Sequence, residues 1–155
     1  MKTLNYKELL SILSYTLDQN NLQKRYFIAL AGPPASGKST ISEKLNQDLN
    51  LKGFPSDILQ MDGFHLDDAI LSSKNLLPRK GSPETFDVMG LKSFLIRLAA
   101  ESEVIVPIFD RSLELSRSSA VTILENKKII IVEGNYLLLN SHPWNELNDY
   151  FDSKV

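Results

Sequence analysis

The sequence has 155 residues, enough for about one domain with a sizeable core, and its apolar (43%) and charged (23%) fractions are those of an ordinary globular protein. Its formal net charge of −2 gives no general attraction to nucleic acid or to an anionic membrane, so we expect neither as a partner and any anion-binding site to be local. The sequence contains no cysteine, which excludes disulfides, thiolate metal sites and a cysteine nucleophile.

No part of the sequence has the form of a targeting or membrane segment. The N-terminal stretch mixes charged and polar residues throughout, unlike the uninterrupted apolar region of a signal peptide. The longest apolar runs, within YFIALAG and KKIIIVEG, are far too short to span a bilayer. We therefore expect a cytoplasmic protein, and we leave open whether it forms a homodimer.

The N-terminal third of the chain predicts a helix followed by a βαβ unit. Leucine and isoleucine recur at helical spacing over residues 5–19, and the continuous apolar run at 26–31 is typical of a strand buried on both faces. A second helical pattern ends at Gly53, and a second short strand follows at 56–61. Residues 26–61 therefore predict two parallel strands joined by a helix.

The rest of the chain continues the alternation of strand and helix. Residues 62–88 carry most of the turn residues and predict a long surface segment with room for one helical turn. A helix is expected at 90–102, strands at 103–109 and 127–134, and a short helix that Pro143 opens. This order predicts one α/β domain with a mostly parallel sheet.

The segment GPPASGKST, which we call the phosphate loop (residues 32–40), carries the clearest chemical signal. It matches the pattern G-x-x-x-x-G-K-[ST] and lies between a predicted strand and a predicted helix. Glycines let successive N–H groups face one point, and the helix N-terminus adds positive charge there. A turn with a solvated lysine does not need this spacing, so we expect a bound nucleoside triphosphate. The expected contacts are Gly32, Pro33, Ala35, Ser36, Gly37, Lys38, Ser39 and Thr40.

Two acidic residues stand at the ends of predicted strands. Asp62 lies in QMDGFHLDD, which by itself fits a metal cage, a catalytic base or a polar turn, and Glu133 ends the strand IIIVEG. The carboxyl ends of parallel strands face the ligand crevice, so both should lie on the same edge as the phosphate loop. Asp67 and Asp68 are expected to begin a short helix rather than to bind metal.

At this point the sequence resembles a known family, the phosphoribulokinase, uridine kinase and bacterial pantothenate kinase group of small-molecule kinases. The resemblance spans nearly the whole chain through motifs in the family's order. They are GPPASGKST, MDGFH, RKGSPETFDV (79–88), VPIFDR (106–111) and IIIVEGNYLLL (129–139). Motifs matched in order are far more specific than a phosphate loop alone.

The resemblance implies a P-loop NTPase fold, a three-layer α/β/α arrangement with a mostly parallel sheet. It implies ATP- and Mg²⁺-dependent phosphorylation of a hydroxyl group on a sugar, a nucleoside or a pantothenate-like acid. Asp62 would orient the acceptor hydroxyl or take its proton, with Lys38 beside the phosphates and Ser39 and Glu133 at the metal. Acceptor contacts would come from His65, Arg79, Lys80, Phe86, Phe109, Arg111 and Tyr136.

The family pattern continues beyond the motifs of this sequence. In the family, a segment like the final DYFDSKV introduces a further central strand, followed by an arginine-bearing lid and a part that contacts adenine. We therefore expect one domain over 1–155, with a helical segment at 1–22 and an incomplete nucleotide-binding core at 23–155 that lacks the last central strand, the lid and the C-terminal part. A catalytically silent nucleotide-binding or interaction fragment is the alternative. A regulatory NTPase is a weaker one, because it leaves DGFH and RKGSPETFD unexplained.

Overall fold

The computed structural model describes residues 3–155. Its elements alternate along the chain as the apolar patterns predict, and short 3₁₀ helices interrupt the connections. The helices are α1 (Tyr6–Asp18), α2 (Lys38–Leu51), α3 (Asp68–Ser73) and α4 (Val88–Ala100), with 3₁₀ helices η1 (Met61–Phe64), η2 (Leu77–Arg79), η3 (Pro83–Thr85) and η4 (Trp144–Tyr150). The strands are β1 (Tyr26–Ala31), β2 (Ser56–Gln60), β3 (Val104–Asp110), β4 (Leu115–Ile123), β5 (Ile129–Gly134) and β6 (Ser153–Lys154).

The main sheet has the strand order β2-β5-β1-β6, and all of its strand pairs are parallel. Strand β5 therefore lies between β1 and β2, although those two are consecutive strands in the sequence. Leu30 of β1 and Gln60 of β2 both face Glu133 across the sheet, so the three strands end at a common edge. The prediction of a mostly parallel sheet is confirmed.

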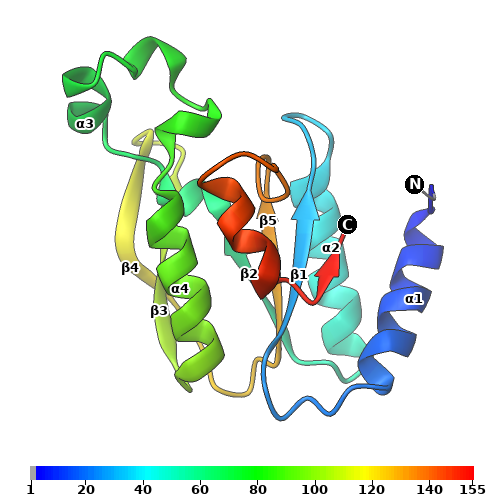
Figure 1. The fold of residues 1–155 in the computed structure, drawn as a ribbon. Helices are drawn as coiled ribbons and strands as arrows, with labels where there is room; N and C mark the ends of the chain where they lie inside the picture. Colours follow the sequence, from blue (N-terminus) through cyan, green and yellow to red (C-terminus); the bar gives the residue numbers. More distant parts are fainter. Residues whose placement is uncertain (1–2) are drawn as a thin grey trace.

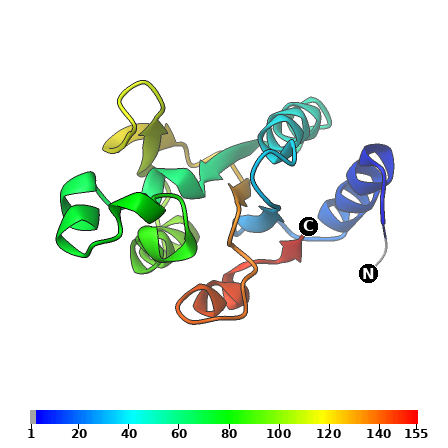
Figure 2. The same cartoon turned by 90° about the horizontal axis from the view of Figure 1, so that it is seen from above.

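Helices cover both faces of the main sheet, which gives three layers (Figures 1 and 2). Successive residues of a strand point to opposite faces, so β1 divides its side chains between two cores. Phe27 packs in the core that includes α4 and η4, while Ile28 packs in the core under α1 and α2. This explains why β1 and β5 are apolar throughout rather than alternating with polar residues.

The third predicted strand lies outside the parallel sheet. Strand β3 pairs antiparallel with β4 in a separate two-stranded sheet, and the register shifts between Val106 and Ile108. Pro107 lies at that shift, and proline has no N–H to donate to a ladder. Strand β4 is not predicted by the sequence, because the stretch SRSS lacks an apolar run and most of the strand is solvent-exposed.

Residues 62–88 hold more structure than one helical turn and form what we call the arm. The arm comprises η1, α3, η2 and η3, and in Figure 1 its central part projects beyond the ends of the sheet strands. Helix α3 begins where expected, because the Asp67 side chain accepts a hydrogen bond from Ala69 N at 2.9 Å and Asp68 is the first helical residue.

The last central strand, which the family pattern led us to expect to be missing, is represented by β6. Its Ser153 and Lys154 pair with Ile28 and Ala29 of β1. The preceding Asp152 also supports β1, since its carboxylate accepts a hydrogen bond from Phe27 N at 2.8 Å. Within residues 3–155, none of the helices has the length and apolar character that a bilayer crossing requires.

Candidate active site

The phosphate loop joins the end of β1 to the start of α2. Ala35 and Gly37 both have positive φ angles, of 58° and 82°, so the loop adopts the left-handed conformation twice before the helix begins. Gly37 is the N-cap of α2, and within the described chain this cap offers no side-chain acceptor to the first helical turn. The N–H groups of that turn are therefore available to an anion, with the helix dipole in the favourable direction.

Lys38 and Glu133 lie together between the phosphate loop and the end of β5. Lys38 Nζ is 3.9 Å from Glu133 Oε1 and donates a hydrogen bond to Pro33 O at 3.3 Å, and the two side chains are only 12% and 10% exposed. Burial raises the pKa of Glu133, while attraction to Lys38 and the Ser39 hydroxyl oppose the rise. Because the cost of burying the ionised carboxylate is only partly offset, Glu133 is suited to bind a cation.

The donor set beside the phosphate loop fits Mg²⁺. This ion prefers oxygen ligands and is commonly held by one or two protein groups together with phosphate oxygens. The Ser39 hydroxyl and the Glu133 carboxylate line the same cleft and supply such oxygens. These two residues would hold the ion, with a nucleotide's phosphates completing its coordination.

Asp62 faces Glu133 from the neighbouring strand end. It lies in η1 directly after β2, and Arg111 Nη2, from the turn after β3, is 3.7 Å from Asp62 Oδ2. The phosphate loop, Asp62, Arg111 and Glu133 enclose a cleft of about 400 Å³. Asn135, which is not among the residues expected from the sequence, also lines this cleft. Its position, a polar residue just beyond the carboxyl end of β5, is the signal that identifies it.

A close backbone contact fixes where η1 sits. A Cβ added at Gly134, the last residue of β5, would overlap the Met61 side chain, so only glycine lets the two segments approach. On the other side, the Ser116 hydroxyl of β4 donates to the His65 carbonyl at 3.2 Å. Asp62 is thus held between β5 and the β3–β4 hairpin.

Three of the expected acceptor residues form one aromatic stack. The His65 ring lies between Phe86 and Phe109, with ring centroids 4.2 and 4.6 Å away. His65 Nδ1 is buried and has no hydrogen-bond partner among residues 3–155. Burial lowers the pKa of His65, which favours the neutral imidazole at physiological pH.

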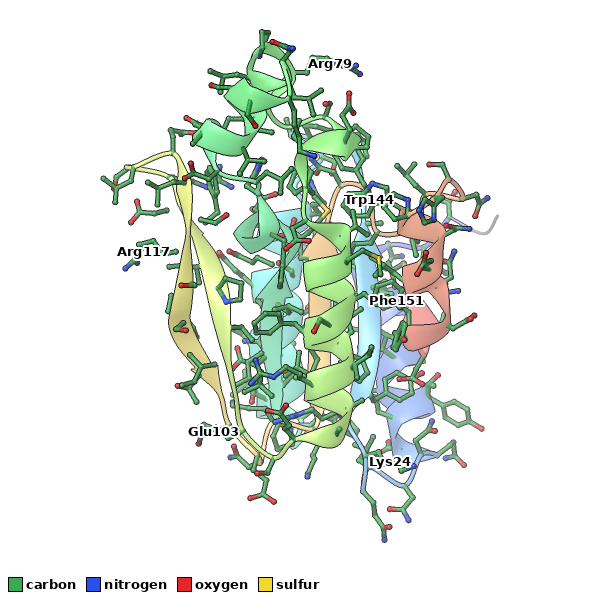
Figure 3. The ribbon with its side chains drawn as sticks, turned by 60° about the vertical axis from the view of Figure 1, so that its left-hand side comes forward. Lys24, Arg79, Glu103, Arg117, Trp144 and Phe151 are labelled. Atoms are coloured by element: carbon green, nitrogen blue, oxygen red, sulfur yellow. The ribbon has the colours of Figure 1, made fainter. Side chains whose placement is uncertain are left out.

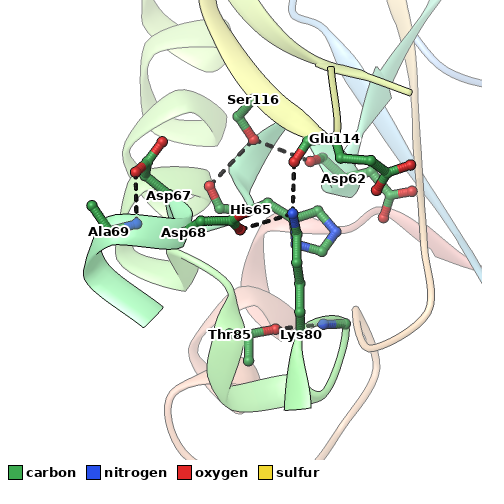
Figure 4. Close-up of polar contacts among 10 residues, drawn as sticks. Asp62, His65, Asp67, Asp68, Ala69, Lys80, Thr85, Glu114 and Ser116 are labelled. Atoms are coloured by element: carbon green, nitrogen blue, oxygen red, sulfur yellow. Dashed lines mark hydrogen bonds and ion pairs between the residues drawn. The ribbon is translucent and has the colours of Figure 1, made fainter. Parts of the chain in front are cut away.

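The other expected acceptor residues differ in their placement. Tyr136 donates its hydroxyl hydrogen to Gly81 O at 2.7 Å and so ties the arm to the segment after β5. Lys80 turns inward, toward Phe109 and the β3–β4 turn (Figure 4). Arg79 instead pairs with Glu84, is 65% exposed, and lies at the outer end of the arm, away from the cleft (Figure 3).

Comparison with known proteins adds a solved relative of the same fold. No protein-family model matches the sequence. A candidate fructose transport system kinase from Silicibacter sp. TM1040, solved by crystallography, superposes with a TM-score of 0.92 at 37% sequence identity. The match covers 98% of this chain and 73% of that chain.

Curated sequences point to kinases as well. The chain is 33% identical to a candidate uridine kinase of Schizosaccharomyces pombe over 86% of its length, and 32% identical to a pantothenate kinase of Limosilactobacillus reuteri over 88%. It spans 60% of the first of these proteins and 46% of the second.

Proposed function

Because the chain belongs to the phosphoribulokinase, uridine kinase and pantothenate kinase-like family of P-loop kinases, we propose that it transfers the γ-phosphoryl group of ATP, with Mg²⁺, to a hydroxyl group of a small metabolite. The observation that carries the proposal is the single cleft in which the phosphate loop, Glu133, Asp62 and Arg111 meet. Sugars, nucleosides and pantothenate-like acids are the acceptor classes to test.

On the nucleotide side, the residues of the cleft would bind the negatively charged phosphates. The N–H groups of the phosphate loop and the start of α2 would hold the phosphates, and Lys38 would neutralise oxygens of the β- and γ-groups. Mg²⁺ held by Ser39 and Glu133 would screen the charge that develops during transfer. These residues position the phosphates and need no covalent chemistry of their own.

On the acceptor side, Asp62 would accept a hydrogen bond from the attacking hydroxyl. As the oxygen bonds to the γ-phosphorus and the bond to the β-phosphate oxygen breaks, the hydroxyl proton passes to the Asp62 carboxylate. Arg111, which is 78% exposed and 3.7 Å from Asp62, can turn its guanidinium toward the transferring group. ADP and a phosphate monoester are the products.

Asp62→Asn tests the assignment directly. Asparagine keeps the shape of the side chain but cannot take a proton, so turnover should fall by roughly 10²–10⁴-fold while Mg²⁺–ATP affinity changes little. ADP release with D-fructose, uridine or pantothenate measures turnover, and calorimetry measures affinity. Asp57→Asn is the matched control, because Asp57 lies on β2 and its carboxylate accepts from Ile58 N at 2.8 Å. Unchanged turnover in Asp62→Asn would remove that residue from the mechanism.

The same measurements separate the kinase from a silent nucleotide-binding module. The chain spans 62% or less of the length of the first curated relatives. A silent module would be stabilised by Mg²⁺–ATP, by about 2.7 kcal/mol at a ligand concentration of 100 Kd, yet would phosphorylate none of the acceptors. Stabilisation together with acceptor-dependent ADP release supports the kinase.

A further inference from the structure

Lys80 makes an unusually complete set of contacts for a lysine next to a candidate acceptor site. Its Nζ donates to the Glu114 carbonyl at 2.6 Å and pairs with Asp68 Oδ1 at 2.8 Å (Figure 4). It also lies 5.9 Å from the centroid of the Phe109 ring, and the side chain is 20% exposed. An ammonium group has three donors, so these contacts occupy most of its capacity.

The partners of Lys80 come from two segments that are far apart in the sequence. Asp68 begins α3 in the arm, whereas Glu114 lies in the turn between β3 and β4. Glu114 has a φ of 53°, a left-handed conformation that costs free energy in a residue with a side chain. The hydrogen bond from Lys80 to its carbonyl compensates for that strain.

The turn that Lys80 holds also carries Arg111. The Asp110 carboxylate accepts hydrogen bonds from Ser112 N and Leu113 N at 3.0 and 3.1 Å, and Asp110 pairs with Leu115 across the hairpin, so residues 110–115 form one closed turn. Fixing Glu114 therefore fixes the backbone from which the Arg111 guanidinium reaches Asp62. A displacement of this turn would move Arg111 away from the reacting hydroxyl.

We propose that Lys80 is a positioning residue rather than an acceptor ligand: the contacts Asp68–Lys80–Glu114 act as a latch that holds the β3–β4 turn, and with it Arg111, against the cleft. This inference rests on the proposed function for its effect on turnover, but the latch itself is a property of the fold. It gives Lys80 a role different from the acceptor contact that the family resemblance implies.

Asp68→Asn distinguishes a latch from an acceptor contact. If Lys80 is a latch, Lys80→Met should lower kcat/KM for the acceptor about tenfold and Asp68→Asn should lower it about threefold, with the KM for ATP unchanged. The double variant should be no worse than Lys80→Met, because both changes break one connection. Lys80→Arg keeps a cationic donor that can reach both Asp68 and the Glu114 carbonyl, so this variant should retain most of the activity. The acceptor is whichever of D-fructose, uridine or pantothenate the unaltered chain phosphorylates fastest.

Amide hydrogen exchange tests the latch without any turnover. In Lys80→Met and in Asp68→Asn, the amides of Ser112 and Leu113 should exchange at least about threefold faster than in the unaltered chain. Lys92→Met is the matched control, because Lys92 pairs with Glu146 at 2.6 Å and is 24% exposed but lies on α4. That variant should leave exchange in the β3–β4 turn unchanged.

Each outcome decides one of the two proposals. If Asp68→Asn leaves kcat/KM unchanged or raises it while Lys80→Met abolishes it, Lys80 contacts the acceptor and the latch is wrong. Unchanged exchange in both variants also overturns the latch. If the unaltered chain phosphorylates none of the acceptors, the proposed function fails, and exchange in the turn still decides whether Lys80 holds it.

Discussion

At the scale of single residues, the buried carboxylate of Glu133 lowers the stability of the unliganded protein and favours the binding of a cation. Burial raises its pKa, and Lys38, 3.9 Å away, offsets only part of that effect. The ionised carboxylate therefore lowers the free energy of unfolding when no cation is bound. Residues that are costly in the unliganded protein are typical of binding sites.

Glu133→Gln should raise the melting temperature by a few degrees at neutral pH. Because folding raises the pKa of Glu133, the cost of ionisation is complete above the folded-state pKa and absent below the unfolded-state pKa. The increase in melting temperature should therefore shrink as the pH falls from the folded-state pKa to the unfolded-state pKa of Glu133, and it should vanish at lower pH. Thermal unfolding measured across this range checks the prediction.

Glu146→Gln provides a control of opposite sign. Its partner Lys92 lowers the pKa of Glu146, so this carboxylate stabilises the fold above its unfolded-state pKa and loses that contribution as the pH falls. Glu146→Gln should therefore not raise the melting temperature at neutral pH. A similar gain in both variants would contradict the assignment of the effect to burial of Glu133.

At the scale of elements, the position of η1 depends on how closely β5 approaches it. Gly134 has no side chain, and Met61, fully buried, fills the space where one would be. The residue after Met61 is Asp62, so the same contact that packs β5 against η1 also determines where the carboxylate lies.

Gly134→Ala should affect stability and turnover together. The added methyl group overlaps Met61, so we expect a loss of roughly 1–3 kcal/mol in the free energy of unfolding and a displacement of Asp62 that lowers kcat at least about tenfold. Urea unfolding and acceptor-dependent ADP release measure the two effects. Gly53→Ala is the control: Gly53 has a φ of 86° but open space around it, so that variant should lose stability and keep its turnover.

At the scale of the whole molecule, the cleft lies at one end of the sheet, and Arg25 forms a structural centre at the other end by joining several connections through hydrogen bonds. The Arg25 guanidinium, just before β1, donates to five backbone carbonyls at 2.6 to 3.0 Å. They belong to the end of α4 and to the connections before β3 and β5, namely Leu98, Glu101, Ser102, Leu124 and Lys127.

Arg25→Met should destabilise the protein by about 3 kcal/mol, because it removes charge-assisted hydrogen bonds and leaves several carbonyls without a partner. Nucleotide affinity should stay unchanged, since the cleft lies at the other end of the strands. Urea unfolding and calorimetry with Mg²⁺–ATP measure these quantities. Arg97→Met is the comparison: Arg97 makes an exposed i,i+4 pair with Glu101, and such exposed pairs contribute little to stability. Equal losses in the two variants would show that Arg25 is not a structural centre.

The sequence predicts those parts of the molecule whose signal is local. Strands β1 and β5 are continuous apolar runs, and the phosphate loop carries its chemistry in consecutive residues, so both could be assigned before the structure. The expectation that Asp62 and Glu133 share one edge followed from the parallel connection of β1 and β2. The catalytic and binding roles of these residues remain predictions.

Features that depend on distant backbone could not be predicted. Strand β4 has no apolar run, because it is a solvent-exposed edge strand whose partner within residues 3–155 is β3. One of the two partners of Lys80 is a carbonyl 34 residues away, and a backbone carbonyl gives no signal in the sequence because every residue has one. Arg25 donates to five backbone carbonyls, so its role could not be predicted from the sequence either.

The strand order has a consequence for folding. Strands β1 and β2 each need β5 as a partner, yet β5 follows β1 by about one hundred residues, so a ribosome releases both strands long before the strand that joins them. Pairing between such distant segments requires the closure of a long loop and is intrinsically slow. Until residue 134 emerges, the apolar stretch YFIALA has no sheet neighbour to cover it, and the nascent chain is expected to need protection from aggregation at that stage.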